Sequence, residues 1–372
     1  MSASTIRPCG AGSTSDGTCA AGGVVNSDEG GAGTREDVPS GELPGRRGLL
    51  GGSAAVALLL AACRSAGSAA QQGGAAGGAY AFGRPLKAGF VNAGLANSWP
   101  AQGKATTEQW GKWLGIDVTW YDGGLSIEKQ RKAVDDMATK TWDFVAIQAF
   151  GIDTLVDPVS QMIGRGIPVV QMDTIIAKDD PGIVTFLEPD NVAMAAQVTE
   201  TIFKAIGGKG NVIMTQGALG HSGARKRAEG FRQTLARYPD IKLLAEDTAE
   251  WDVNKTAKLW EDYLVKFPKI DGAFFHSDDM ALAASRVIKN AGREVKLGSV
   301  DAMPEAIEAV KDGRLLVSAR NSSARIHWGA LIVGSMAATG AKSMPKHIQI
   351  DGPLVTKEIA DGVAFMESHF LL

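Results

Sequence analysis

From about residue 84 onward, short apolar runs alternate with segments whose apolar residues recur at helical spacing. Between Val192 and Ile206, apolar residues fall at i, i+3, i+4 and i+7, which places them on one face of a helix. The apolar runs predict strands near 86–92, 116–121, 144–149, 168–172, 183–188, 211–216, 241–246, 271–276, 295–300 and 315–319. Further helices are expected near 100–114, 126–140, 154–165, 222–237, 253–267, 278–291, 304–312 and 323–339.

This alternation of strands and helices predicts an α/β fold. Strands that are almost continuously apolar are typical of parallel sheets with helices on both faces. Ten strands with mostly short connections fit two doubly wound parallel sheets better than one. Such sheets bind ligands beyond the carboxyl ends of their strands, so the residues directly after each apolar run are candidate site residues.

Polar and aromatic side chains follow several of the predicted strands. They are Asn97, Trp99, Gln148, Asp173, Ser277, Asp301 and Asn321, with Arg227 nearby. Carboxylates and guanidinium groups bind vicinal hydroxyls in a two-pronged fashion, and an aromatic face packs on the apolar side of a sugar ring. The set therefore suits a polyhydroxylated ligand.

Each of these candidates also has a structural interpretation. For Trp99 and Trp251 the alternative is an ordinary place in the hydrophobic core. For Asp173 and Asp301 it is the capping of a helix N-terminus, a position that Asp favours. For Arg227 it is a surface ion pair, which contributes little to stability.

The remaining polar residues give no sign of a metal centre or cofactor site. The five histidines are scattered without metal-ligand spacing, so His221 and His276 stay outside the predicted core of the site. Asp278 and Asp279 are interpreted as charges favoured at a helix N-terminus. All three cysteines precede residue 84, which leaves none for a zinc cluster, an internal disulfide or a nucleophile. We expect no cofactor.

The first 83 residues differ in composition from the remainder. They hold 19 of the 46 glycines, whereas all eight tryptophans lie at or beyond Trp99. Such a segment cannot bury enough apolar surface to offset its ordering entropy. We expect residues 1–62 to be a signal or leader peptide, and residues 63–83 to be a flexible linker that begins at a lipidated Cys63.

The lipidation hypothesis depends on the residues before Cys63. Arg46 and Arg47 precede an uncharged stretch of 14 residues that ends at this cysteine. The stretch is shorter than the roughly 20 residues that span a bilayer and matches a signal peptide. Residues 60–63 (LAAC) resemble a lipobox, and the alternative is an ordinary secretory signal with an incidental cysteine. Both the twin-arginine and the general secretory routes remain open.

Charge and motifs argue against other protein classes. Beyond residue 62, 34 basic residues face 35 acidic ones, whereas nucleic-acid binding needs a basic footprint. A repressor would carry a helix-turn-helix where this chain has its leader. Residues 92–97 (NAGLAN) lack the G-x-G-x-x-G pattern of a dehydrogenase, and neither a P-loop nor a G-x-S-x-G elbow occurs. We expect no enzyme and no nucleic-acid partner.

From about residue 84 to its end, the chain resembles the periplasmic sugar-binding proteins of ABC transporters, in the ribose-binding subfamily. The motifs that carry this resemblance keep the family's order and spacing: IPVVQMD (167–173), EPDN (188–191), SGARKRAEGF (222–231), HSDDMALAA (276–284) and VDAMPEA (300–306). The resemblance implies a type I periplasmic binding fold. It also implies capture of a monosaccharide or sugar alcohol for an ABC permease and its ATPase subunit. The alternative is the ligand-binding component of a sensory or signal-uptake system.

The resemblance assigns ligand contacts to individual residues. Hydrogen-bonding and charged contacts are implied for Asn97, Asp173, Arg227, Asp301 and Asn321, and stacking contacts for Trp99 and Trp251. Gln148 is added from its place after a predicted strand. Three site positions depart from the ribose binders, because Pro100 replaces an aromatic residue, Thr174 an arginine and Ser277 an asparagine. These departures favour a linear polyol or a sugar other than ribose.

The family has two lobes joined by three crossover strands. The resemblance implies an N-terminal lobe of residues 84–189 plus 322–351 and a C-terminal lobe of residues 190–321 plus 352–372. Closure about this hinge would bury the ligand. We expect a monomer, exported and either periplasmic or anchored to the outer face of the cytoplasmic membrane through lipid on Cys63.

Overall fold

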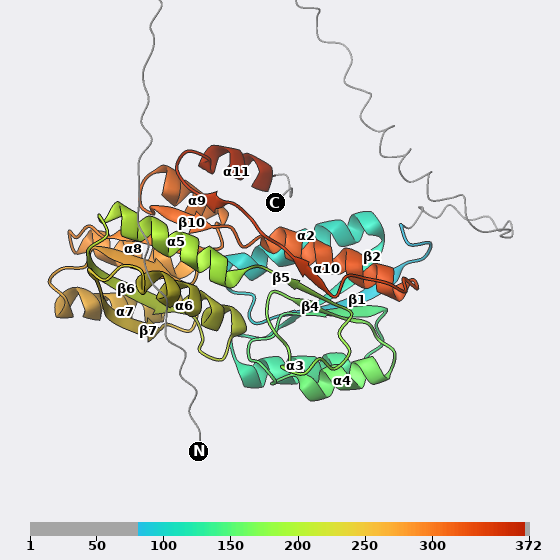
Figure 1. Ribbon diagram of the computed structural model, residues 1–372. Coiled ribbons are helices and arrows are strands. Elements are labelled where there is room, and N and C mark those ends of the chain that lie inside the picture. Colours follow the sequence, from blue (N-terminus) through green and yellow to red (C-terminus); the bar gives the residue numbers. More distant parts are fainter. Residues whose placement is uncertain (1–80, 369–372) are drawn as a thin grey trace, which may run out of the picture. The chain divides into compact units, whose positions relative to one another are not determined.

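The computed structural model describes residues 81–368, which contain two six-stranded sheets (Figure 1). The first sheet has the strand order β11-β5-β4-β3-β1-β2, and all its strand pairs are parallel. Its strands are β1 Leu86–Asn92, β2 Ile116–Asp122, β3 Phe144–Ile147, β4 Val169–Met172, β5 Thr185–Glu188 and β11 His347–Gln349. The expectations for residues 1–80, including the signal peptide and Cys63, lie outside the described residues.

The second sheet has the strand order β12-β10-β9-β8-β6-β7. Its strands are β6 Gly210–Gln216, β7 Ile241–Thr248, β8 Gly272–Phe275, β9 Lys296–Val300, β10 Val317–Ala319 and β12 Leu354–Val355. Four of its strand pairs are parallel, and β12 runs antiparallel to β10 at the edge. The predicted class of two doubly wound parallel sheets is confirmed, with this antiparallel edge strand as an addition.

Helices cover both faces of the first sheet. α2 (Ser98–Leu114) and α10 (Ser323–Ala338) lie side by side on one face, and α3 (Ile127–Ala138) and α4 (Val156–Gly164) cover the other (Figure 1). Successive strand residues alternate between the two faces. In β3, Phe144 therefore packs in the α10 layer and Val145 in the α3 and α4 layer.

The second sheet is covered in the same way. α5 (Asn191–Ala205) and α6 (Ser222–Leu235) pack on one face around Phe274. The opposite face, with Phe275 and Trp260, carries α7 (Val253–Lys266), α8 (Asp278–Asn290), α9 (Pro304–Lys311) and α11 (Ala360–Glu367). Among residues 81–368, no helix has the length and apolar character needed to cross a membrane.

Local sequence signals fix several helix ends. The side chains of Ser126, Asp190, Asp252 and Ser322 each accept a backbone N–H in the first turn of the following helix, which satisfies an otherwise unpaired donor. α2 ends at Gly115, which adopts the left-handed backbone conformation (φ +72°) that glycine permits without steric cost.

The chain passes between the sheets three times. It enters the second sheet after β5, returns after β10 into α10, and crosses again between β11 and β12. The predicted strands and helices all occur, with ends shifted by a few residues. β11, β12 and α11 were not predicted, because their sequences show no clear periodicity of apolar residues.

Candidate functional site

Residues from both sheets line one cavity. The lining includes nine of the ten ligand-contact residues expected from the sequence: Asn97, Trp99, Gln148, Asp173, Arg227, Trp251, Ser277, Asp301 and Asn321. Most of them lie directly beyond the carboxyl end of a strand, where parallel α/β sheets bind ligands.

Asp173 contributes a buried carboxylate from the first sheet. It follows β4 on left-handed backbone (φ +61°), and its N–H donates to Leu187 O at 2.7 Å. The Gln148 side chain donates from Nε2 to Asp173 Oδ2 at 2.8 Å, and the Ala93 N–H donates to Gln148 Oε1 at 3.1 Å. No helix begins between Asp173 and β5, so Asp173 does not cap one. Its carboxylate is oriented for the cavity.

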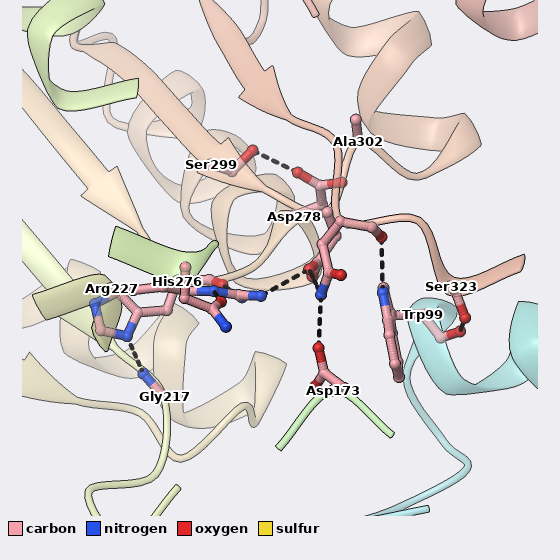
Figure 2. A network of polar contacts seen from close by, with 12 residues as sticks. Trp99, Asp173, Gly217, Arg227, His276, Asp278, Ser299, Ala302 and Ser323 are labelled. Carbon is pink, nitrogen blue, oxygen red and sulfur yellow. Dashed lines mark hydrogen bonds and ion pairs between the residues drawn. The ribbon is translucent and has the colours of Figure 1, made fainter. Parts of the chain in front are cut away.

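Asp301 is the matching carboxylate of the second sheet. It follows β9 with φ +121°, and the N-cap of α9 is Met303, which excludes the capping alternative for Asp301. Asn321 connects the two carboxylates, because its Nδ2 lies 3.1 Å from Asp173 Oδ1 and 3.5 Å from Asp301 Oδ1. In Figure 2, Asp173 approaches this network from below and Arg227 from the left.

Arg227 is buried beside Asp301 and is held by several partners. Its Nε donates to Asn191 Oδ1 at 2.7 Å, its Nη1 donates to His276 O, and its Nη2 lies 3.4 Å from Asp301 Oδ1. The residue is only 4% exposed, so the surface ion-pair interpretation does not hold. The guanidinium also lies 5.7 Å from the Trp251 ring centroid, within cation–π distance.

Trp251 forms one wall of the cavity. It lies beyond β7 on left-handed backbone (φ +65°), and its indole packs directly against Gly217. A Cβ at Gly217 would lie 2.1 Å from the indole, so only glycine leaves room for this ring. Trp251 also belongs to the core cluster of the second sheet, so it is both a core residue and a cavity residue.

Trp99 forms a second aromatic wall from the first turn of α2. Its Nε1 donates to Asn321 O at 2.9 Å, and its own carbonyl accepts the Ser323 hydroxyl at 2.5 Å (Figure 2). His327 packs against the indole at a centroid distance of 5.1 Å. Trp99 is thereby tied to the segment in which the chain returns to the first sheet.

Asn97 and Asp279 make direct contacts between the two sides of the cavity. Asn97 Nδ2 donates to Trp251 O at 3.3 Å. Asp279 Oδ2 accepts the Ser98 N–H at 2.9 Å, at the start of α2, where a carboxylate is electrostatically favoured. The sequence interpretation gave Asp279 only a helix-terminal role, whereas the structure also places it in the cavity lining.

Asp278 lies beneath the cavity and holds the surrounding strands together. Its carboxylate accepts hydrogen bonds from the Ser299 hydroxyl (2.5 Å), the Ser318 hydroxyl (2.7 Å) and the Met303 N–H (2.6 Å). Burial raises the pKa of this carboxyl to about 6, although the three hydrogen bonds favour its charged form. Asp278 thus anchors α9 and β9 behind Asp301.

Ser277 and Thr174 differ in how they are used. Ser277 lines the cavity, and its buried hydroxyl has no hydrogen-bond partner among the described residues. Thr174 is the one expected contact residue outside the lining. Its hydroxyl donates to Ala149 O at 2.7 Å, and the side chain is fully buried beside the first sheet rather than turned toward a ligand.

Sequence reasoning left His221 outside the core of the site, but the structure places it in the cavity wall. Its ring contacts Trp251 edge to face at a centroid distance of 5.3 Å, and its buried Nδ1 has no partner among the described residues. The position could have been found from the sequence, because His221 lies beyond β6 and directly precedes α6. Pro100, Ala93, Gly94 and Leu125 complete the lining.

Burial governs the charges around the cavity. It lowers the pKa of His221 to about 4, against the opposing effect of Asp173, so the imidazole is neutral at physiological pH. Burial also lowers the pKa of His276 well below its ordinary value. The pKa of the Asp301 carboxyl is raised well above its ordinary value by burial, an effect that Arg227 opposes.

The polar groups are suited to hydrogen bonding rather than to metal coordination. Trp251 Nε1 and Asn321 Oδ1 are buried without a partner among the described residues, as are the atoms of Ser277 and His221 noted above. Donors and acceptors of this kind, between two indoles, fit a compact ligand with many hydroxyl groups. No group of three or more potential metal ligands occurs within the described part of the chain.

Comparison with known proteins gives the family. Residues 88–339 match the model of the periplasmic binding protein domain. The chain is 30% identical over 269 residues to a xylitol-binding protein of Mycolicibacterium smegmatis, with 71% of this chain and 76% of that protein covered. It is 28% identical over 246 residues to a ribose import binding protein of Salmonella typhimurium, with 66% and 82% covered.

A solved structure shows the same fold. It is the periplasmic binding protein component of an arabinose ABC transporter from Shewanella sp. ANA-3, bound to L-arabinofuranose. The TM-score is 0.71 at 25% identity, and the match covers 77% of this chain and 97% of that one. The resemblance found in the sequence motifs is thus confirmed, and the chain belongs to the periplasmic binding protein domain family.

Proposed function

We propose that this chain is an extracytoplasmic solute-binding protein that captures a monosaccharide or sugar alcohol for an ABC import permease. The observation that carries the proposal is the convergence of two carboxylates, a guanidinium and two indoles on one cavity between the sheets. Asp173 and Asp301 accept hydrogen bonds from hydroxyl groups, and Arg227 donates them in a fixed fork. Trp99 and Trp251 pack against the C–H faces of the same ligand.

Two features favour a polyol or a sugar other than ribose. Pro100 stands in the lining where the ribose binders have an aromatic residue, and Thr174 is turned away from the cavity. One relative is named a xylitol-binding protein, which supports a five-carbon sugar alcohol as a candidate ligand. The proposed contact set therefore consists of the nine lining residues without Thr174.

The proposed lobes follow the two sheets, with residues 84–189 plus 322–351 in one and 190–321 plus 352–372 in the other. Ligand binding would favour the closed arrangement of the lobes by its differential affinity for that state. The closed, monomeric protein would then dock on the permease, which works with an ATPase subunit. We propose no catalytic step, since the named relatives are binding proteins.

The proposed location is the outer side of the cytoplasmic membrane, with an anchor of lipid on Cys63. The lipobox-like residues 60–63 and the uncharged stretch before them support this anchor. Two or more acyl chains would hold the protein stably, whereas one would not. The mass of the mature N-terminal peptide measures both the cleavage site and the lipid.

A thermal-shift screen against pentoses, hexoses, linear polyols and inositols tests the ligand class. A cognate ligand at about a hundred times its Kd should add about 2.7 kcal/mol to the free energy of unfolding. Asp173→Asn and Arg227→Lys should each weaken binding by about tenfold or more. The first removes the charge of the accepting carboxylate, and the second keeps the charge but removes the planar fork of guanidinium donors.

Matched controls are Asp157→Asn, on a side chain that is 81% exposed on α4, and Arg237→Lys on the surface of the second lobe. Both controls should bind as the parent protein does. Full affinity in Asp173→Asn or Arg227→Lys would show that the site is elsewhere. The absence of any stabilisation across the screen would show that the ligand is not a sugar or polyol.

A further inference from the structure

Three tryptophans form an aromatic surface on the outer side of α2 and α10, away from the cavity. Trp110 and Trp113 lie on the last turns of α2, and Trp328 lies on α10. The Trp110 ring stacks on Trp328 at 5.8 Å and meets Trp113 edge to face at 5.2 Å. Trp110 and Trp328 are half-buried, whereas Trp113 is 61% exposed.

Apolar side chains extend this surface along α10. Trp328, Ile332 and Met336 are spaced by four residues and therefore lie on one face of the helix. Ile332 is half-buried and Met336 is 42% exposed. α2 and α10 pack side by side (Figure 1), so the two helices present one continuous apolar surface, here called the tryptophan face. Scattered exposed apolar residues are ordinary in soluble proteins, but clustered ones mark interaction sites.

The tryptophan face lies at the end of the first lobe where the chain enters it. The Leu86 N–H, at the start of β1, donates to the carbonyl of Gly115, the residue that ends α2 beside Trp113. Cys63 precedes the first described residue by 18 positions in the sequence. A segment of that length spans at most about 65 Å, so the face is within reach of a bilayer that holds Cys63.

The chemistry of the face fits a lipid surface. Tryptophan concentrates at the membrane–water interface, where the ring meets acyl chains and the indole N–H meets polar head groups. Lys112 in the last turn of α2 and Lys342, four residues beyond the end of α10, are exposed near the ends of these two helices, and neither forms an ion pair with a described residue. Lysines in this position are attracted to anionic head groups.

We propose that the tryptophan face rests on the outer surface of the lipid bilayer and sets the resting orientation of the anchored protein. Trp113 and Met336 enter the head-group region, and the lysines lie among the head groups. The reach argument depends on the proposed anchor at Cys63, but the contact itself is a property of α2 and α10. Ligand exchange is unimpeded, because the face lies on the outer side of the helices.

The test uses vesicles of phosphatidylcholine and phosphatidylglycerol with the chain from residue 63 carrying Cys63→Ser, which has no lipid. Sedimentation with the vesicles should show weak binding. Trp113→Ser and Met336→Ser should each lower it, Trp113→Ser by about tenfold or more, because burial of a large apolar side chain is lost. Brominated lipid should quench part of the tryptophan fluorescence of the parent chain. The quenching that Trp113 contributes should be missing in Trp113→Ser.

Val265→Ser is the matched control, since Val265 is 89% exposed on α7 in the second lobe, and it should bind vesicles as the parent chain does. Equal vesicle binding by the parent and Trp113→Ser would overturn the proposal, as would no binding by either. Sedimentation velocity of the same samples distinguishes self-association: a dimer that Trp113→Ser abolishes, without vesicle binding, also overturns it. Thermal shifts with the sugar panel should be the same in all these variants, which separates this proposal from the proposed function.

Discussion

The residues that shape the cavity are held in backbone conformations that L-amino acids rarely adopt. Asp173, Trp251 and Asp301 all have positive φ. Such residues cost of order 1–3 kcal/mol each and persist where the surrounding structure fixes them. Here the fixing contacts are visible, for example the Asp173 N–H bond to Leu187 and the packing of Trp251 on Gly217. The site is therefore arranged before a ligand arrives.

The buried histidine of the cavity gives a prediction about pH. In the folded chain the pKa of His221 is lowered from 6.5 to about 4. Between these values the unfolded state takes up a proton that the folded state does not, so stability is lost as the pH falls. His221→Asn removes the imidazole and places a residue favoured at N-caps where the His221 side chain makes no capping bond. Between about pH 7 and about pH 4.5, the variant should lose about 2–3 kcal/mol less of its free energy of unfolding than the parent.

Denaturant unfolding at the two pH values measures this difference. His347→Asn provides the comparison, because the His347 side chain is 71% exposed and lies outside the cavity lining, and this variant should follow the parent protein. If His221→Asn lost as much stability on acidification as the parent, the imidazole would not be buried in the neutral form.

The sequence predicted much of the site because its residues follow strands. Asp173, Asp301 and Asn321 each lie within two residues of a strand end, and parallel strands bring their carboxyl ends to one edge. The position of a residue after a strand does not show which way its side chain points. Thr174 directly follows Asp173, yet its hydroxyl bonds to Ala149 O, since neighbouring residues point to different sides of the chain.

At the scale of elements, close contact between helices and sheets depends on small residues. Gly334 in α10 faces the ring of Phe144 in β3, and a Cβ added there would lie 2.1 Å from it. A Cβ added at Gly329, about one and a half turns earlier in the same helix, would lie 3.5 Å from Leu187 Cδ2, which is an ordinary van der Waals contact. α10 therefore approaches the first sheet most closely near its C-terminal half.

These two glycines give a matched pair of predictions. Gly334→Ala should lower the free energy of unfolding by about 1–3 kcal/mol, because Phe144 or the helix must move. Gly329→Ala should raise it by about 0.5–1 kcal/mol, because alanine favours the helix and the space is free. Chemical denaturation measures both, and an equal effect of the two substitutions would contradict the described packing.

The elements that the sequence missed are short. β11 and β12 have three and two residues, and they form by pairing with the edges of β5 and β10. Tertiary pairing of this kind leaves no periodic pattern in the sequence. The long helices, by contrast, were predicted because their apolar faces repeat over several turns.

At the scale of the whole described part, the two sheets are linked around the cavity by direct contacts as well as by the three crossings. The Asp279 carboxylate accepts the Ser98 N–H, and Lys226 Nζ lies 3.1 Å from Glu188 Oε2. The first of these bonds joins a helix N-terminus to a carboxylate, an electrostatically favourable pair. Such bonds stabilise the arrangement in which both sheets contact one ligand.

Asp279→Asn tests the role of this contact. The loss of a charge-assisted hydrogen bond should weaken ligand affinity by about tenfold, mainly through faster dissociation, because association is limited by encounter. Stopped-flow tryptophan fluorescence measures the two rate constants. Asp262→Asn, an exposed position on α7, should leave both unchanged. An unaltered dissociation rate in Asp279→Asn would show that the Ser98 contact does not hold the lobes together.

The second crossing, after β10, has a consequence for how the protein is made. The first sheet begins with β1, but its edge strand β11 and its covering helix α10 come from much later in the chain, and Thr185 bonds to Pro345 across 160 positions. Contacts of such separation form slowly, because a long loop must close first. The first lobe thus stays incomplete during most of translation. Completion of the first sheet therefore has to wait until β11 (His347–Gln349), close to the end of the chain, has been synthesised.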